Sequence, residues 1–184
     1  MSDRERLPPI SQDQMTPEQV KAAQAITAGP RGALRGPFAV LIRSPVLMDR
    51  VQKLGEHIRF GGVLADDHRE FAILVTGARW KQRYEWSVHA GLAAKAGVRQ
   101  DVIEALGEDR RPDGLSEDEQ VIYGFCRNLN VTGTVGDDLF EGAKARFGEA
   151  GVVELSALCG YYTMLAMMLN VAGTPPLDGI KTPF

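Results

Sequence analysis

Residues 70–89, EFAILVTGARWKQRYEWSVH, contain three groups that can move protons near neutral pH. These are the carboxyl groups of Glu70 and Glu85 and the imidazole of His89. Apolar residues surround them at helical spacing. Glu85 lies four residues before His89, so on a helix the two side chains share a face, one turn apart. With Glu70 brought in from a preceding helix, these side chains predict an acid–base pocket.

The helical pattern around this stretch continues from about residue 65 to residue 95. One unbroken helix of that length is unusual in a globular domain, so we expect a break within residues 81–84. The second helix should end at Gly97, because glycine is favoured directly after a helix C-terminus. The stretch therefore predicts two consecutive helices that carry the candidate groups.

Helix-start signals place two more helices before this pair. A capping box with proline at the first helical position starts a helix at Thr16 that should end near Ala28. Residues 31–44 are expected to form a loop. The next helix begins at Ser44-Pro45 and is closed by the glycine pair at residues 61–62.

After residue 97 the sequence predicts further helices and no strand. Residues 99–106 form a short helix, and a second capping box at Ser116 starts another. A helix over residues 137–147 precedes the most apolar segment, residues 149–171, which is typical of a buried central helix. The predicted fold class is therefore all-α, with an N-terminal arm at residues 1–16, a helical domain at residues 17–172 and a C-terminal tail at residues 173–184.

A weak internal similarity joins two of these segments. The stretches that begin at Glu70 and Glu154 share an acidic start, an apolar helix and a small residue near its end. Two related helical halves packed face to face would explain it, and chance similarity between two apolar helices explains it equally well.

The composition is that of an ordinary globular chain. Of 184 residues, 44% are hydrophobic and 24% are charged, which suits one domain with a sizeable core. A net charge of −3 gives no electrostatic case for nucleic acid or for an anionic membrane surface. No apolar run approaches the roughly 20 residues that span a bilayer, so no membrane partner is expected. The N-terminus has no secretory signal, and Cys126 and Cys159 form no paired motif, so we expect a cytoplasmic protein.

The run EFAILVTGARWKQRYEWSVHAGLAAKAGV resembles the carboxymuconolactone decarboxylase family, whose fold is shared with the AhpD-type alkylhydroperoxidases. The resemblance extends over most of residues 40–175. Its specific part is EWxxH at residues 85–89, with an upstream glutamate and a downstream AGV. It implies an AhpD-like helical domain.

AhpD-type members carry a CxxC between that glutamate and the histidine. Here Glu70 and His89 match the glutamate and the histidine, while Gln82 and Glu85 occupy the two cysteine positions. Disulfide-based peroxide reduction needs a thiolate and a resolving thiol, so this departure removes that mechanism. Decarboxylase-type members also lack the cysteines and keep an acidic residue four before the histidine, so the chain is more similar to that branch.

The resemblance implies a lyase or isomerase acting on a cyclic or aromatic-derived carboxylate. His89 would donate the proton, Glu85 would orient it and tune its pKa, and Glu70 would complete the relay. Substrate contacts are predicted for Gln82, Arg83 and Trp86, although packing explains Trp86 and a surface position explains Arg83 equally simply. The alternative for His89 is a buried structural histidine.

No cofactor and no metal are expected. Glu70, Glu85 and His89 could in principle ligate a metal, but no additional ligand spacing supports this. Two other functions stay open: an antioxidant hydroperoxidase without the CxxC, which would have to use Cys126 or Cys159 or a metal, and a non-catalytic ligand-binding protein. The only partners expected are a small-molecule substrate and copies of this chain.

The resemblance points to a homo-oligomer, as a trimer or a hexamer. The arm and the tail carry apolar residues without predicted regular structure, which favours their docking onto another surface. These residues are Leu7, Ile10, Leu177, Ile180 and Phe184.

Overall fold

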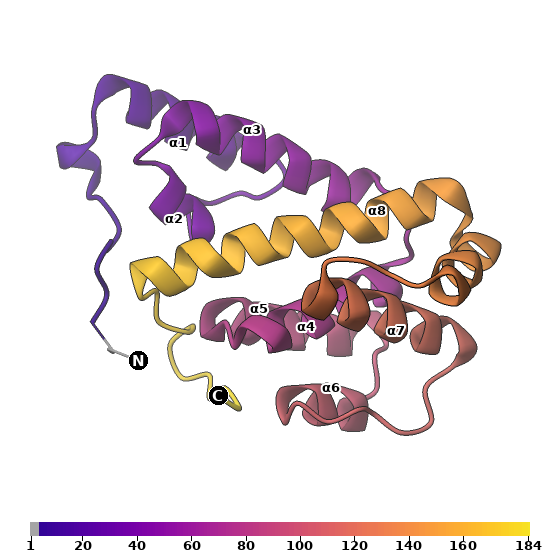
Figure 1. The fold of residues 1–184 in the computed structure, drawn as a ribbon. Helices are drawn as coiled ribbons and strands as arrows, with labels where there is room; N and C mark the ends of the chain where they lie inside the picture. The colour runs from indigo at the N-terminus through magenta and orange to yellow at the C-terminus, as the bar shows by residue number, and fades with distance from the viewer. Residues whose placement is uncertain (1–3) are drawn as a thin grey trace.

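A long apolar helix, α8 (Asp137–Ala172), crosses the molecule between two groups of shorter helices, as Figure 1 shows. Helices α1 to α3 lie on one side of it and α4 to α7 on the other. This computed structural model describes residues 4–184, within which there are eight α-helices and no strand. The remaining elements are η1 (Gln12–Gln14), α1 (Pro17–Ala28), α2 (Pro37–Leu41), α3 (Pro45–Glu56), η2 (His57–Gly61), α4 (Asp66–Trp80), α5 (Arg83–Ala96), α6 (Gln100–Gly107) and α7 (Glu117–Thr132).

Helix α4 is the most deeply buried element of the fold. Every residue from 70 to 78 is buried, because α4 packs against α5, α7 and α8 together. Phe71, Ile73 and Leu74 are each only 1% exposed. Glu70 is therefore held within the core, and its position is fixed by packing around the whole circumference of the helix.

The predicted break between α4 and α5 falls at Lys81. Its backbone is left-handed, with φ 47° and ψ 41°. The N–H of Lys81 donates to the carbonyl of Ala78, and the N–H of Gln82 donates to that of Gly77. Two such bonds around a left-handed residue satisfy the last carbonyls of a helix. The chain then reverses, which lays α5 against α4.

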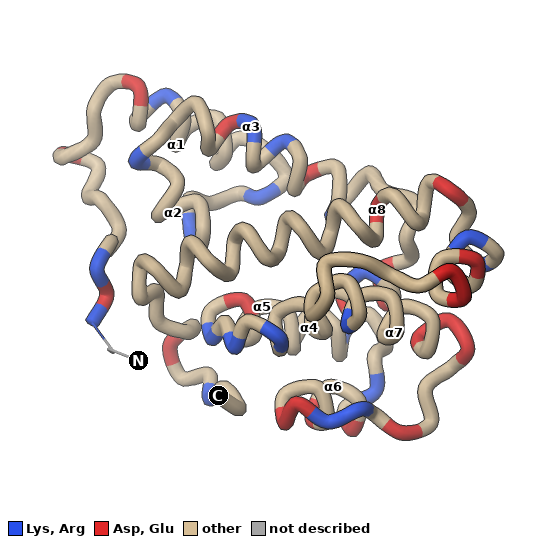
Figure 2. The backbone as a smooth tube through the Cα atoms, viewed as in Figure 1, with Lys and Arg blue, Asp and Glu red and all other residues tan. Residues whose placement is uncertain are grey.

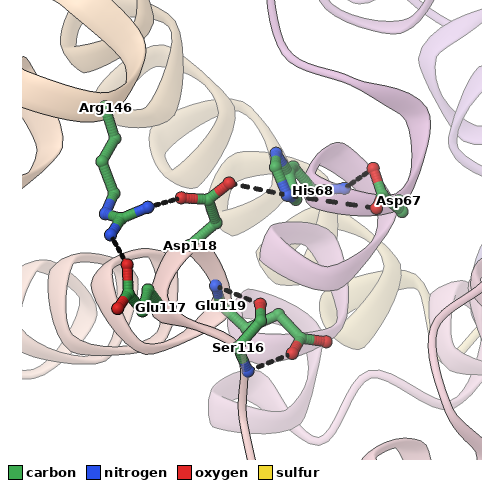
Figure 3. Close-up of polar contacts among 7 residues, drawn as sticks. All are labelled: Asp67, His68, Ser116, Glu117, Asp118, Glu119 and Arg146. Atoms are coloured by element: carbon green, nitrogen blue, oxygen red, sulfur yellow. Dashed lines mark hydrogen bonds and ion pairs between the residues drawn. The ribbon is translucent and has the colours of Figure 1, made fainter.

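Both predicted capping boxes are present. The hydroxyl of Thr16 accepts from the N–H of Gln19, and that of Ser116 accepts from the N–H of Glu119, with both reciprocal bonds formed. Figure 3 shows the second box at the start of α7.

The start of α7 also joins two distant elements. Asp118 lies 3.7 Å from His68 of α4 and pairs with Arg146 of α8, as Figure 3 shows. The His68 ring also packs edge-on against Phe147, with centroids 5.6 Å apart. These contacts fix the first part of α8 against α4 and α7.

The predicted boundary between residues 137–147 and 149–171 is confirmed as a kink. Gly148 has φ 70° and ψ 178°, a conformation that glycine adopts without steric cost, so α8 consists of two helical parts. The prediction of a continuous loop over residues 31–44 is wrong. Pro37 stands at the first helical position of α2, and Phe38 and Leu41 are buried against the core.

Helix α8 changes the sequence-based expectation that no apolar segment is long enough to span a bilayer. It is long and apolar enough to cross a membrane by length and composition alone, although 44% of its most apolar window is buried inside the fold. Figure 2 shows charged residues gathered in the first part of α8, and the sequence has none of them in the helix after Glu154. Its burial against α4 and α7 is what the core helix of a globular protein requires.

The two termini pack on the chain itself. The N–H of Arg6 donates to the carbonyl of Ala172, and the ring of Phe184 lies edge-on to Trp86 at 5.3 Å. Ile10 is likewise partly buried against the core. Much of the apolar surface that suggested docking onto another molecule is thus covered within one chain. Residues 1–3 of the predicted arm lie outside the described residues.

Candidate functional site

A cavity of about 290 Å³ lies between α5, α8, η2 and the segment that joins α1 to α2. Helix α5 contributes Glu85, Val88 and His89 to its wall, and α8 contributes Tyr161, Tyr162 and Leu165. Two of the three predicted proton-transfer groups therefore face one enclosed space. The third, Glu70, lies behind His89 and is not part of the wall.

Glu70 and His89 form a buried hydrogen-bonded pair. The Oε2 atom of Glu70 is 2.7 Å from Nδ1 of His89, and the two residues are 4% and 6% exposed. A carboxylate acceptor at Nδ1 favours the proton on that nitrogen, which leaves Nε2 to exchange protons with a ligand. The ring is also held edge-on by Tyr162, with centroids 5.1 Å apart. The imidazole is thereby fixed in orientation and in tautomer.

Glu85 occupies a different environment. Its backbone N–H donates to the side-chain oxygen of Gln82, which caps the helix, but its own Oε2 is buried without a hydrogen-bond partner. Burial raises the pKa of the Glu85 carboxyl well above its ordinary value. Burial of this kind favours the neutral, protonated form of the carboxyl group, which can act as an acid.

This geometry corrects the predicted division of roles. Glu70, from the preceding helix, is the carboxylate that orients His89. The i, i+4 spacing placed Glu85 and His89 on one face, and both do line the cavity, but Glu85 forms no hydrogen bond to the imidazole. The reason is that Nδ1 of His89 faces α4 and Glu70, which leaves Glu85 to the cavity.

The three predicted substrate contacts lie away from the cavity wall. Gln82 caps α5 and donates to Asn170 at 3.1 Å, so its side chain is occupied structurally. Trp86 packs against Phe184 in the core. Arg83 is exposed at the start of α5. Gln82 and Trp86 therefore support the site from behind.

Among the wall residues with polar groups that sequence reasoning missed are Arg31, Arg59 and Tyr161. They come from the turn after α1, from η2 and from α8, far from the stretch that carries the family resemblance. Tyr161 lies within the apolar segment at residues 149–171, and the two arginines show no motif. No local pattern could have assigned them to the site.

The two cysteines lie in the core, outside the cavity wall. They are 0% and 2% exposed, and the hydroxyl of Thr76 donates to Sγ of Cys159 at 3.7 Å. The neighbouring Cys159 thiol and burial raise the pKa of Cys126 well above its ordinary value. The part of the chain that the structure describes contains no group of three or more His, Cys, Asp or Glu residues that could hold a metal ion.

The arrangement of these helices defines a class of fold. Comparison with solved structures found a similar fold in the crystal structure of an alkylhydroperoxidase AhpD core, an uncharacterized peroxidase-related protein from Ralstonia eutropha JMP134. The TM-score is 0.75 at 15% sequence identity, over 94% of this chain and 92% of that one. No protein-family model and no curated protein matched. The predicted all-α, AhpD-like fold is confirmed.

Proposed function

We propose that the protein is a small-molecule lyase or isomerase that works by proton transfer, acting on a cyclic or aromatic-derived carboxylate. The observation that carries the proposal is the contrast between two groups on one cavity wall. His89 is held by a buried carboxylate 2.7 Å away, whereas Glu85 is buried without a partner. Groups whose environments differ in this way can divide acid and base roles between them.

In this mechanism Nε2 of His89 removes a proton from a carbon next to an electron-withdrawing group, and Glu70 stabilises the imidazolium that forms. The Glu85 carboxyl donates its proton to the substrate. In a decarboxylation the electron pair left by departing CO2 takes up that proton from Glu85. Each group then returns to its starting state by exchange with solvent.

The experiment is an assay of proton exchange and CO2 release across a panel of small lactone and unsaturated carboxylates. His89→Gln and Glu85→Gln should each lower kcat by roughly 10²- to 10⁴-fold, because each removes one proton-transfer group. Glu141→Gln is the matched control, since Glu141 is exposed on α8. If neither wild-type exchange nor turnover appears anywhere on the panel, the proposal fails and a ligand-binding role takes its place.

A hydroperoxidase activity is the second candidate, because the structural neighbour is described as peroxidase-related. Cys126 and Cys159 are the thiols that could support it, and both are buried away from the cavity. Peroxide reduction that disappears in the Cys126→Ser/Cys159→Ser double variant would reverse the ranking. The cytoplasm remains our proposed location, because two buried free thiols suit a reducing compartment.

A further inference from the structure

Two arginine side chains, Arg31 and Arg59, line the cavity that holds His89 and Glu85. The Nε and Nη2 atoms of Arg31 and the Nε atom of Arg59 are buried without a hydrogen-bond partner. Among the ion pairs within residues 4–184, none involves either arginine. Buried donors without partners are rare in folded proteins and call for an explanation.

Both guanidinium groups are held in place by aromatic rings. Cζ of Arg31 lies 4.4 Å from the ring centroid of Phe38, and Cζ of Arg59 lies 5.2 Å from that of Phe60. Stacking of this kind orients the flat face of a guanidinium and leaves its N–H edge for a ligand. Arg59 also lies in η2, a π-helical segment, which is a geometry often found at functional sites.

The hydroxyl of Tyr161 lies beside Arg31 and adds a third buried polar group without a hydrogen bond of normal geometry. Burial raises its pKa to about 12, so it carries its proton at neutral pH. Gly55 of α3 makes room for this arrangement. A Cβ atom there would lie 2.5 Å from Nη2 of Arg31 and would collide with the Tyr161 hydroxyl oxygen. The absence of a side chain at residue 55 thus lets these two donors come together.

The charges on the wall are unbalanced. Three arginines, Arg31, Arg35 and Arg59, and a single carboxyl group, that of Glu85, line the wall, and burial raises the pKa of Glu85, which favours its neutral form. Glu56 acts on Arg31 electrostatically but is not part of the wall. A partly buried cluster of cations with no anion of its own is unfavourable until a ligand supplies one.

We propose that Arg31, Arg59 and Tyr161 bind the carboxylate of a small, planar, unsaturated acid and present its carbon skeleton to His89 and Glu85. The inference rests on the proposed function, since it names the substrate group that this same cavity recognises. A volume of about 290 Å³ equals that of roughly ten water molecules at about 30 Å³ each, which suits a single ring and its carboxylate. Arginine is the side chain best shaped to hold a carboxylate through two parallel hydrogen bonds.

The test is a calorimetric titration of the full-length protein with benzoate, a carboxylate on one planar ring. Arg31→Met and Arg59→Met should each weaken binding roughly ten- to hundredfold, because each removes a charge-assisted hydrogen bond and keeps an apolar stem. Arg31→Lys keeps the charge without the planar fork, so it should fall between the wild type and Arg31→Met. Arg50→Met is the matched control, since Arg50 is exposed on α3 away from the cavity, and it should bind as the wild type does.

Neutral benzamide and phenyl phosphate distinguish the chemistry of the ligand. Benzamide should bind at least tenfold more weakly than benzoate if charge is recognised. Tighter binding of phenyl phosphate than of benzoate would reassign the site to phosphate and overturn the carboxylate. The proposal of a carboxylate site would also be overturned if Arg31→Met and Arg59→Met bound benzoate with unchanged affinity while circular dichroism showed both variants to be folded.

The two proposals fail in different ways. Benzoate binding needs no turnover. Binding that depends on Arg31 and Arg59, with no activity on any substrate, would therefore support the carboxylate site and contradict the proposed enzymatic activity. Turnover that needs His89 but has the same KM in the wild type, Arg31→Met and Arg59→Met would support the proposed enzymatic activity and contradict the carboxylate site.

Discussion

At the scale of single residues, the site depends on two glutamates in different surroundings. Glu70 and Glu85 are each 4% exposed, so exposure does not separate them. Glu70 is compensated by His89 at 2.7 Å, whereas Glu85 has an oxygen with no partner. A buried carboxylate without compensation is so unfavourable that the group takes up a proton instead. The same residue type thus forms a paired carboxylate in one place and, under the function we propose, a proton donor in the other.

This difference predicts how stability depends on pH. Burial raises the pKa of Glu85 in the folded state above its unfolded value of about 4.3, so the folded protein binds the extra proton. Stability therefore falls as pH rises above about 4.3, by up to about 1.4 kcal/mol per pH unit until the folded pKa is reached. Glu85→Gln removes this loss. Denaturant unfolding should show the variant gaining on the wild type from pH 4 toward neutrality.

Glu141→Gln serves as the control for this titration, because its carboxyl is exposed on α8. Its unfolding free energy should follow that of the wild type at every pH. Parallel curves for Glu85→Gln and the wild type between pH 4 and pH 7 would contradict a protonated Glu85.

The sequence singled out Glu70, Glu85 and His89 as candidate proton-transfer groups, but it did not show which of them pair. Helical spacing places Glu85 and His89 on one face, and both line the cavity. The packing of α4 on α5 decides which carboxyl group lies next to which nitrogen of His89. A sequence pattern does not show that packing. Arg31 and Arg59 were out of reach for the same reason, since they join the site only when the segments before α4 fold over α5 and α8.

At the scale of elements, the turn between α4 and α5 builds the Glu70–His89 pair. The two residues are 19 apart in the sequence, and the reversal at Lys81 brings their side chains to 2.7 Å. Lys81 closes the turn in a left-handed conformation that costs a lysine roughly 1–2 kcal/mol. The equivalent position after α5 is Gly97, with φ 106°, where glycine adopts the left-handed region freely.

Replacing Lys81 by glycine should therefore stabilise the fold. We expect a gain of about 0.5–1 kcal/mol, because relief of backbone strain outweighs the added flexibility of the unfolded chain. That gain corresponds to a rise in Tm of about 2 °C for a domain of this size. Lys95→Gly is the matched control, since it removes the same side chain from the exposed last turn of α5, where glycine should cost about 0.5–1 kcal/mol. Equal losses in both variants would show that the turn is not strained.

Helix boundaries with local chemical signals were the ones the sequence could predict. The two capping boxes and the kink at Gly148 lie where proline, glycine or a capping residue marks them, whereas the break at Lys81 was predicted from the length of the helical pattern alone. Helix α2 was missed because five residues are too few to show helical periodicity, although Pro37 marks its start. The π-helical turns of η2 carry no such signal, because they continue directly from α3.

At the scale of the whole molecule, parts of both termini pack on the chain itself. We therefore expect copies of the chain to associate through a surface elsewhere on the molecule. Phe184 and Ile10 pack on the chain's own core. Five exposed apolar side chains lie along α3 and the segment after it, between 46% and 68% exposed: Val46, Leu47, Leu54, Phe60 and Val63. Other exposed apolar side chains, such as Val153, Val171 and Ile180, are spread over α8 and the tail. Clustered apolar surface such as that along α3 is typical of interaction sites.

We therefore expect the homo-oligomer, a trimer or a hexamer, to form through the surface of α3. Light scattering at micromolar concentration should give three or six times the chain mass of 20.1 kDa. Leu47→Glu and Leu54→Glu should shift the protein toward the monomer, because a buried unpaired carboxylate disfavours association strongly. Val131→Glu is the matched control, since Val131 is 55% exposed on α7, away from that surface. A wild-type mass of 20.1 kDa would refute the oligomer, and an intact oligomer in both leucine variants would place its contacts elsewhere.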